Sequence, residues 1–114
     1  MSRPGPRVRI FPGGAEARIG DERYEVEWQE MTAAGQKRHD ADPNRDHDPD
    51  RDERHVREYC ATLEQARTKA AAIVAGGTTV YGVATVTRQV VDYIDGGPRD
   101  VGEWNDVGDP EYVD

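Results

Sequence analysis

The stretch ERYEVEWQEM, residues 22–31, decides the fold class. Its apolar residues Tyr24, Val26 and Trp28 alternate with glutamate and glutamine. An alternation with a period of two is the pattern of a β-strand that buries one face and exposes the other. Residues 22–31 are therefore predicted to form a strand of a sheet with one solvated face, on which Glu25 and Glu27 lie.

Two shorter segments upstream show the same alternation. Residues 7–11 and 15–19 each place apolar residues at every second position, and the sequence Pro-Gly-Gly separates them at residues 12–14. Proline and glycine at such a position indicate a turn between strands. Together with residues 22–31, these segments predict a three-stranded antiparallel meander.

The downstream half predicts a loop, two strands and a helix. Residues 35–54 are polar and rich in Asp and Arg, so we expect a long mobile loop. Residues 56–60 can form a short strand, and Thr62 begins a capping box for a helix over residues 63–75. The β-branched run over residues 80–94 predicts the longest strand.

This order of elements predicts an α+β fold, strand-strand-strand-loop-strand-helix-strand. We expect a twisted, mainly antiparallel sheet of about five strands with one helix packed on one face. Residues 1–94 would form the single domain, including the loop at 35–54, and residues 95–114 would form an acidic C-terminal tail. The order of the strands in the sheet and the oligomeric state do not follow from the sequence.

Composition places the chain among small acidic proteins. It has 114 residues, a net charge of −8 and one cysteine, Cys60, which excludes an internal disulfide. The longest apolar run, residues 70–75, is too short to span a bilayer, and the N-terminus lacks the apolar core of a secretion signal. We therefore expect a cytoplasmic protein with no membrane partner.

The chain contains several residues of types that bind metals or catalyse reactions, but none of them forms a complete motif. Residues 42–53 place oxygen ligands at EF-hand positions, but His47 stands where the calcium loop needs glycine, so a calcium-binding module is the less favoured alternative. His39, His47 and His55 are eight residues apart, which does not fit ligands on one helix face. A Cys60–His55 pair lacks any surrounding catalytic motif. The prediction is a non-enzymatic protein without metal or cofactor.

The excess of negative charge lies at the C-terminus. Residues 92–114 carry eight acids against Arg99 alone, and the same segment contains Trp104 and Tyr112. In one interpretation these aromatics fold back onto the sheet. In the other they anchor a basic partner that the carboxylates attract, and both hold if only one aromatic docks inward. The residues expected to bind a partner are Glu25, Glu27, Asp100, Glu103, Trp104, Asp106, Asp109, Glu111 and Tyr112.

Charge also predicts the class of partner. Direct nucleic-acid binding is disfavoured because phosphates require a basic surface. An acidic surface instead suits a basic protein surface, such as the groove of a nucleic-acid-binding complex, where carboxylates mimic phosphates.

Two segments carry a resemblance. RYEVEW at residues 23–28 and the run ATVTRQVVDYIDGGPRDVGEWNDVGDPEYVD at 84–114 resemble small uncharacterised acidic proteins encoded on bacterial phages and plasmids. The resemblance implies a mobile-element setting and no catalytic residue. In that setting we expect an inhibitor that occupies a basic groove, for example an anti-CRISPR protein. The alternative is a structural or accessory protein whose tail docks on its own domain.

Overall fold

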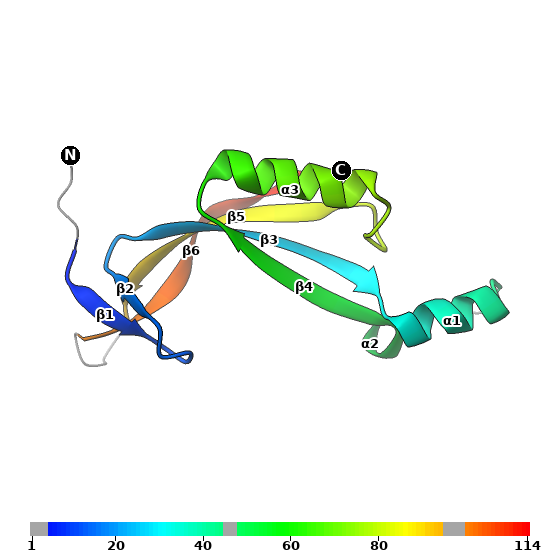
Figure 1. Ribbon diagram of the computed structural model, residues 1–114, viewed down its shortest axis with the longest axis horizontal. Helices are drawn as coiled ribbons and strands as arrows, with labels where there is room; N and C mark the ends of the chain where they lie inside the picture. Colours follow the sequence, from blue (N-terminus) through cyan, green and yellow to red (C-terminus); the bar gives the residue numbers. More distant parts are fainter. Residues whose placement is uncertain (1–4, 45–47, 95–99) are drawn as a thin grey trace.

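The computed structural model describes residues 5–44, 48–94 and 100–114, and within them shows an α+β fold. A mixed sheet has the strand order β2-β1-β6-β5-β3-β4, and all neighbours are antiparallel except β1 and β6 (Figure 1). In chain order the elements are β1 (Arg7–Ile10), β2 (Glu16–Arg18), β3 (Glu22–Met31), α1 (Ala33–Ala41), α2 (Pro49–Asp52), β4 (Glu53–Cys60), α3 (Leu63–Ala75), β5 (Ala84–Tyr93) and β6 (Val101–Val113).

The α+β class is confirmed, but the described chain has six strands and three helices where we predicted about five strands and one helix. Strand β3 and helix α3 coincide with their predicted ranges. The Thr62 side chain caps α3 by accepting a hydrogen bond from the Gln65 N–H at 3.1 Å, as the capping box predicted. Strong local signals therefore specified the two elements at the centre of the molecule.

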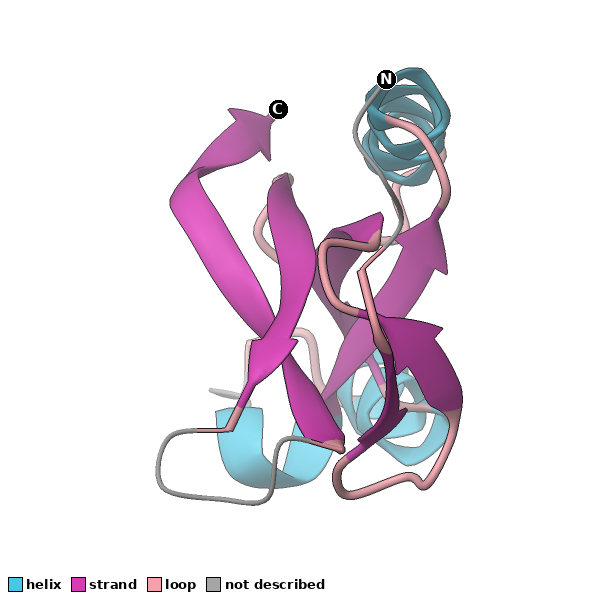
Figure 2. Ribbon diagram, turned by 90° about the vertical axis from the view of Figure 1, so that its left-hand side faces the viewer, coloured by secondary structure: helices cyan, strands magenta, loops and turns pink. Residues whose placement is uncertain are grey.

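The predicted meander is only partly right. Strand β1 pairs with β2, but β3 pairs with β4 and β5 and not with β2. The chain passes from β2 to β3 through Gly20 and Asp21, whose backbone groups form hydrogen bonds of 2.9 Å with Val91 on β5. The connected β2–β3 segment therefore contacts β1 at one end and β5 at the other, and the strands curve into a half-barrel (Figure 2).

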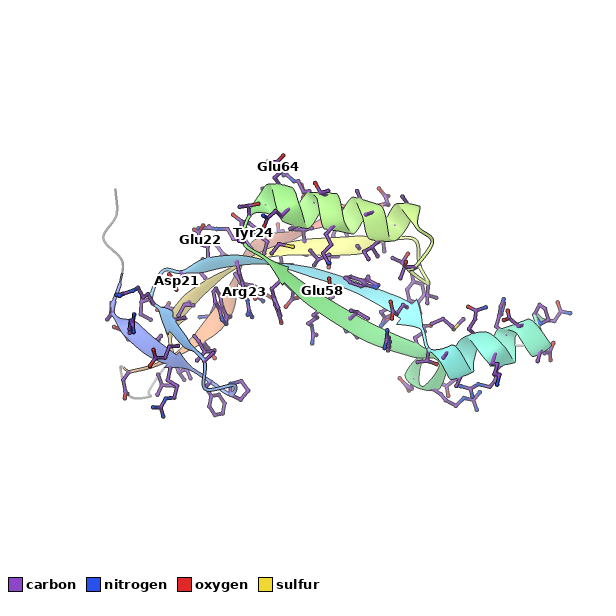
Figure 3. The ribbon with its side chains drawn as sticks, viewed as in Figure 1. Asp21, Glu22, Arg23, Tyr24, Glu58 and Glu64 are labelled. Atoms are coloured by element: carbon purple, nitrogen blue, oxygen red, sulfur yellow. The ribbon has the colours of Figure 1, made fainter. Side chains whose placement is uncertain are left out.

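Two small apolar clusters lie on opposite faces of the sheet. The first cluster lies under α3 and joins its buried Ala66 and Ala70 to β3 and β5, which contribute Val26, Trp28, Ala84 and Val86. The second cluster lies inside the half-barrel and consists of Val8, Ile10 and Val91, with Trp104 packed against it. Because side chains alternate along a strand, Tyr24 lies on the α3 side and Arg23 on the opposite side (Figure 3). We call that opposite side the uncovered face.

The molecule is elongated. Its extents are 55 × 28 × 20 Å, and its radius of gyration of 17.7 Å exceeds the roughly 13 Å expected of a compact domain of this length. The half-barrel lies at one end and α1 projects from the other (Figure 1). Much of the sheet surface is consequently left without a covering layer.

The predicted loop at residues 35–54 is largely helical. Helix α1 has no apolar face and is held at its base by Asp52, the last residue of α2. The Asp52 carboxylate accepts hydrogen bonds from the Asp48 N–H at 3.0 Å and the Arg38 Nε at 2.8 Å, which lower its pKa to about 2. Gly35 packs so closely on Asp52 that a Cβ there would lie 2.4 Å from the Asp52 carbonyl oxygen. This contact between distant residues had no counterpart in the local sequence pattern.

The segment predicted as an acidic tail contains a strand of the sheet. Residues 101–113 form β6, which lies between β1 and β5 in the sheet. Glycine, proline and aspartate are depleted in strands, which is why this segment did not predict one. The pairing of β6 with β5 is irregular. Its register shifts between Val86 and Arg88 of β5, and Gly108 of β6 adopts a φ of 75° there. The segment predicted as the longest strand, residues 80–94, contains β5 with ten residues, and β6 with thirteen is longer, so that prediction is wrong.

Candidate partner-binding surface

The uncovered face of the sheet carries polar side chains from four strands. On β3 these are Arg23, Glu25 and Glu27, which lie opposite Gln89, Thr87 and Thr85 of β5. The flanking strands add side chains that pair with these positions: His55, Arg57 and Tyr59 on β4, and Trp104, Asp106 and Tyr112 on β6. The alternation of β3 therefore places two predicted site residues, Glu25 and Glu27, on the face that α3 leaves open.

Arg23 links the two ends of this face. Its guanidinium carbon lies 3.7 Å from the ring centroid of Tyr59 and 4.2 Å from that of Trp104, so the cation is held between two aromatic rings. The Arg23 Nε also donates a hydrogen bond of 2.8 Å to the Gln89 Oε1. Burial lowers the pKa of Arg23, and the nearby Tyr59 and Glu25 oppose this shift. Trp104 is thus engaged by the protein's own arginine and by the second cluster.

Gln89 is the centre of a hydrogen-bonded network. Its side-chain amide donates to the Glu25 Oε2 at 3.2 Å and to the Asp106 Oδ1 at 2.8 Å. Both Gln89 and Glu25 are buried, with exposed fractions of 7% and 9%. Burial raises the pKa of Glu25, and the neighbouring Glu27 and Asp106 carboxylates raise it further, whereas Arg57 opposes the rise. Glu25 is therefore a structural carboxyl group with little surface to offer a partner.

Glu27 is also engaged within the chain. Its carboxylate pairs with the His55 Nε2 and lies 3.4 Å from the Arg57 Nε. Partial burial opposes its ionisation, but hydrogen bonds with Glu25, His55 and Arg57 outweigh that effect and lower the pKa of Glu27. The charges of Glu25 and Glu27 are thus largely compensated by basic residues of β4.

The acids of β6 and the preceding turn have a different environment. Within the described ranges, none of Asp100, Glu103, Asp106 and Asp109 forms an ion pair with a basic side chain, and three of the four are exposed, Glu103 being half-buried. Glu111 is the exception, because its carboxylate receives the Arg67 Nε of α3 at 2.8 Å. Most carboxylates of the sheet that have no ion pair in the described residues therefore lie along β6, and Asp92 at the end of β5 is a further exposed one.

Strand β6 also has an open edge. Its pairing with β1 covers only Val101 and Gly102, so in the described chain the following residues have a strand, β5, on one side alone. Tyr112 is 69% exposed and Val107 is 39% exposed along this stretch. We call residues 103–113, with both faces and the open edge, the β6 surface.

The structure places most of the predicted site residues on one face or the other of the sheet, whereas Asp100 lies in the turn before β6 and Glu103 lies opposite Asp92 of β5. Trp104, Asp106 and Tyr112 lie on the same face as Glu25 and Glu27, opposite Val91, Gln89 and Thr85 of β5. Glu111, opposite Val86, lies on the α3 side, and Asp109 lines a shallow cavity there with Arg67 and Arg88. Of the two aromatics, one docks inward and the other is exposed.

Sequence reasoning missed the residues that organise the uncovered face. The alternation of β3 could have placed Arg23 beside Glu25 and Glu27, because all three have the same parity. Gln89 and Tyr59 gave no signal, since their roles depend on which strands become neighbours.

The residues of the calcium-loop and Cys60–His55 alternatives do not form a site in the described chain. Asp46 and His47 lie outside the described residues, and Glu53 begins β4 and accepts a hydrogen bond from the Tyr81 hydroxyl at 2.9 Å. No group of three metal-ligating side chains occurs in the described ranges. Cys60 packs with the first cluster, whereas His55 lies on the uncovered face, so this pair does not meet.

Comparison of the chain with protein-family models, with curated proteins and with solved structures found no match. None of the helices in the described part has the length and apolar character needed to cross a membrane.

Proposed function

We propose that the protein is a non-enzymatic binding protein whose β6 surface recognises a basic surface of a partner protein. The observation that carries this proposal is the set of carboxylates along β6 that have no ion pair within the described residues, Glu103, Asp106 and Asp109, on the strand that also exposes Tyr112 near its end. Carboxylates without a basic partner of their own attract a basic surface over several ångströms, and an exposed aromatic ring supplies contact area.

The backbone of β6 favours contact through side chains over the addition of a partner strand. Gly108 interrupts the regular pairing, and Pro110 lacks an N–H group to donate. A bulge and a proline at an open edge are features that prevent another strand from extending the sheet. A basic groove that accepts the side chains of β6 therefore fits this surface better than an extended peptide.

The resemblance to mobile-element proteins favours a nucleic-acid-binding complex of the host as the owner of that groove. Carboxylates spaced along a strand would then occupy positions of phosphates, and the protein would act as an inhibitor, with an anti-CRISPR protein as the concrete example. The alternative, a structural or accessory protein, draws support from the engagement of Trp104 within the fold.

A charge-neutralisation experiment tests the proposal. The probe is an arginine-rich peptide, and its affinity is measured by isothermal titration calorimetry at increasing salt. Asp106→Asn combined with Asp109→Asn should weaken binding by about tenfold or more, and the affinity of the unaltered protein should fall steeply with salt.

The matched control is Asp40→Asn combined with Asp42→Asn, which changes the net charge equally at exposed positions on and after α1. If both double variants lose the same affinity, only net charge matters and the β6 surface is not the site. Deletion of residues 100–114 is not informative, because it removes a strand from within the sheet.

A further inference from the structure

Strand β4 lies at one end of the sheet and its outer edge has no neighbour in the described chain (Figure 1). All eight of its residues pair in regular register with β3, from Met31 opposite Glu53 to Tyr24 opposite Cys60. It contains no proline, and no register shift interrupts the pairing. The β4 edge is therefore an uninterrupted row of backbone donors and acceptors.

The other open edges of the sheet are poorly suited to pairing. Strand β2 has only three residues, and β6 is interrupted at Gly108 and Pro110. Short edge strands, bulges and prolines are the usual means by which proteins block edge-to-edge association. Strand β4 lacks all three, which sets it apart as an edge that can accept another strand.

The direction of the backbone groups on β4 follows from one hydrogen bond. The Thr32 N–H donates to the Asp52 carbonyl oxygen at 2.7 Å, which continues the β3–β4 ladder by one pair. Since backbone groups alternate in direction along a strand, the even-numbered residues of β4 bond to β3. The N–H and C=O groups of the odd-numbered residues, from Glu53 to Tyr59, therefore point outward.

We propose that two copies of this chain associate through their β4 edges as an antiparallel pair, which joins the two sheets into one. A two-fold axis would pass beside Val56 and place it opposite Val56 of the partner subunit. In that register Arg54 lies opposite Glu58 of the partner subunit, and Glu58 lies opposite the partner subunit's Arg54. Opposite charges at facing positions stabilise antiparallel strands, and the symmetry forms this pair twice.

Side-chain direction supports this register. Arg54 and Glu58 both lie on the α3 side, where they pair with Glu30 and Lys69 of their own chain. Facing residues of an antiparallel pair share a face, so both are correctly placed to meet their counterparts. The next possible register, with the axis beside Arg57, would place two arginines directly opposite each other. Of these two registers, the charge pattern of β4 favours the one with the axis beside Val56.

A groove at the C-terminal end of β4 fits the same arrangement. It is lined by Tyr59, Cys60 and Ala61 and by Glu64 and Thr68 on the adjoining side of α3. Tyr59 is 48% exposed there. In the proposed register, α2 of the partner subunit arrives beside this groove, and a basic side chain of that helix, Arg51 of the partner subunit, approaches Glu64. This inference concerns a different surface from β6 and does not rest on the proposed function.

The mass of the protein in solution tests the proposal. Multi-angle light scattering after size exclusion, over a range of concentrations, should give twice the chain mass of 12.7 kDa. Arg54→Glu alone places like charges opposite each other twice, and Glu58→Arg does the same with the opposite sign. Each should raise the dissociation constant of the dimer by about tenfold or more.

Mixing the two variants provides the decisive measurement. In the mixed dimer, each glutamate of one chain faces an arginine of the other, so the dimer should form again although each variant alone dissociates. A change that merely damaged the fold could not produce this recovery. As a matched control, Arg88→Glu and Glu22→Arg reverse an exposed ion pair away from β4 and should leave the mass unchanged, alone or mixed.

The variant Arg57→Pro gives an independent test of the β4 interface if a charge variant fails to fold. It removes an outward N–H and leaves the ladder to β3 intact, so circular dichroism should be retained while the dimer is lost. A monomeric mass of the unaltered protein at every concentration would overturn the proposal. So would a dimer that persists in both charge variants and in Arg57→Pro.

Discussion

Strands β3 and β6 both carry four carboxylates and both pair with β5, yet only one of them is acidic at the surface. Each carboxylate of β3 has a basic partner, because Glu22 pairs with Arg88 and the other three pair with residues of β4. On β6, Glu111 alone has a basic partner among the described residues, Arg67. Strand β4 contributes three of the partners in a single run, Arg54, His55 and Arg57. The surface charge of a strand is therefore decided by its neighbours across the sheet, and along the open edge of β6 no neighbouring strand supplies a basic side chain to its carboxylates in the described chain.

The largest loss of stability should come from a change at Gln89, whose side chain joins β3 to β6. Gln89→Leu would leave the buried Glu25 and the stacked Arg23 without their hydrogen-bond partner. An unsatisfied buried polar group costs about 1–3 kcal/mol, so the free energy of unfolding in urea should fall by about that amount. Gln36→Leu on the exposed α1 is the matched control and should stay within about 0.5 kcal/mol of the unaltered protein. Equal losses in the two variants would contradict a central role for Gln89.

The pH dependence of the free energy of unfolding should distinguish the carboxyl group of Glu25 from that of Glu27. The pKa of Glu25 is raised above its ordinary value of 4.5, so the folded protein binds more protons than the unfolded chain just above pH 4.5. Its contribution to stability therefore falls as the pH rises through that window, and Glu25→Gln should remove this loss. The pKa of Glu27 is lowered, so its contribution is present above pH 4.5 and is lost as the pH falls through its folded pKa.

The measurement is the free energy of unfolding as a function of pH for the single variants Glu25→Gln and Glu27→Gln. Glu25→Gln should be at least as stable as the unaltered protein at pH 7, and Glu27→Gln should be less stable there. The opposite order at pH 7 would show that the two carboxyl groups have been assigned the wrong environments.

The smallest effect is expected for Glu111, the acid of β6 that has an ion pair within the described chain. Glu111→Gln removes an ion pair between two exposed side chains, Glu111 and Arg67, which solvent screens. The midpoint of thermal unfolding should stay within the error of the measurement. A drop as large as that of Gln89→Leu would mean that the contact between α3 and β6 contributes to the fold more than its exposure indicates.

The sequence allowed the prediction of those elements whose signal is local. The alternation in residues 22–31 and the Thr62 capping box each depend on a few consecutive residues, and both elements were placed correctly. Helix α1 was missed because its position depends on Asp52, more than ten residues away, and on the close approach of Gly35. Strand β6 was missed because its glycines and Pro110 disfavour a strand locally, while pairing with β5 overrides that preference.

The candidate site was predictable in part for the same reason. Alternation placed Glu25 and Glu27 together on the open face, and the charge count located the acidic segment. Which carboxylates acquire a basic partner depends on the order of the strands in the sheet, and no local sequence pattern specifies that order. Arg23, Gln89 and Tyr59 became visible only once β3, β4, β5 and β6 were side by side.

The two apolar clusters share one strand, which has a consequence for how the protein unfolds. Strand β5 contributes Val86 to the cluster under α3 and Val91, on its other face, to the cluster in the half-barrel. Neither cluster can separate from the sheet without exposing one side of the same ten-residue strand. Loss of either cluster therefore weakens the other, and the elongated molecule should melt as one cooperative unit in spite of its divided core.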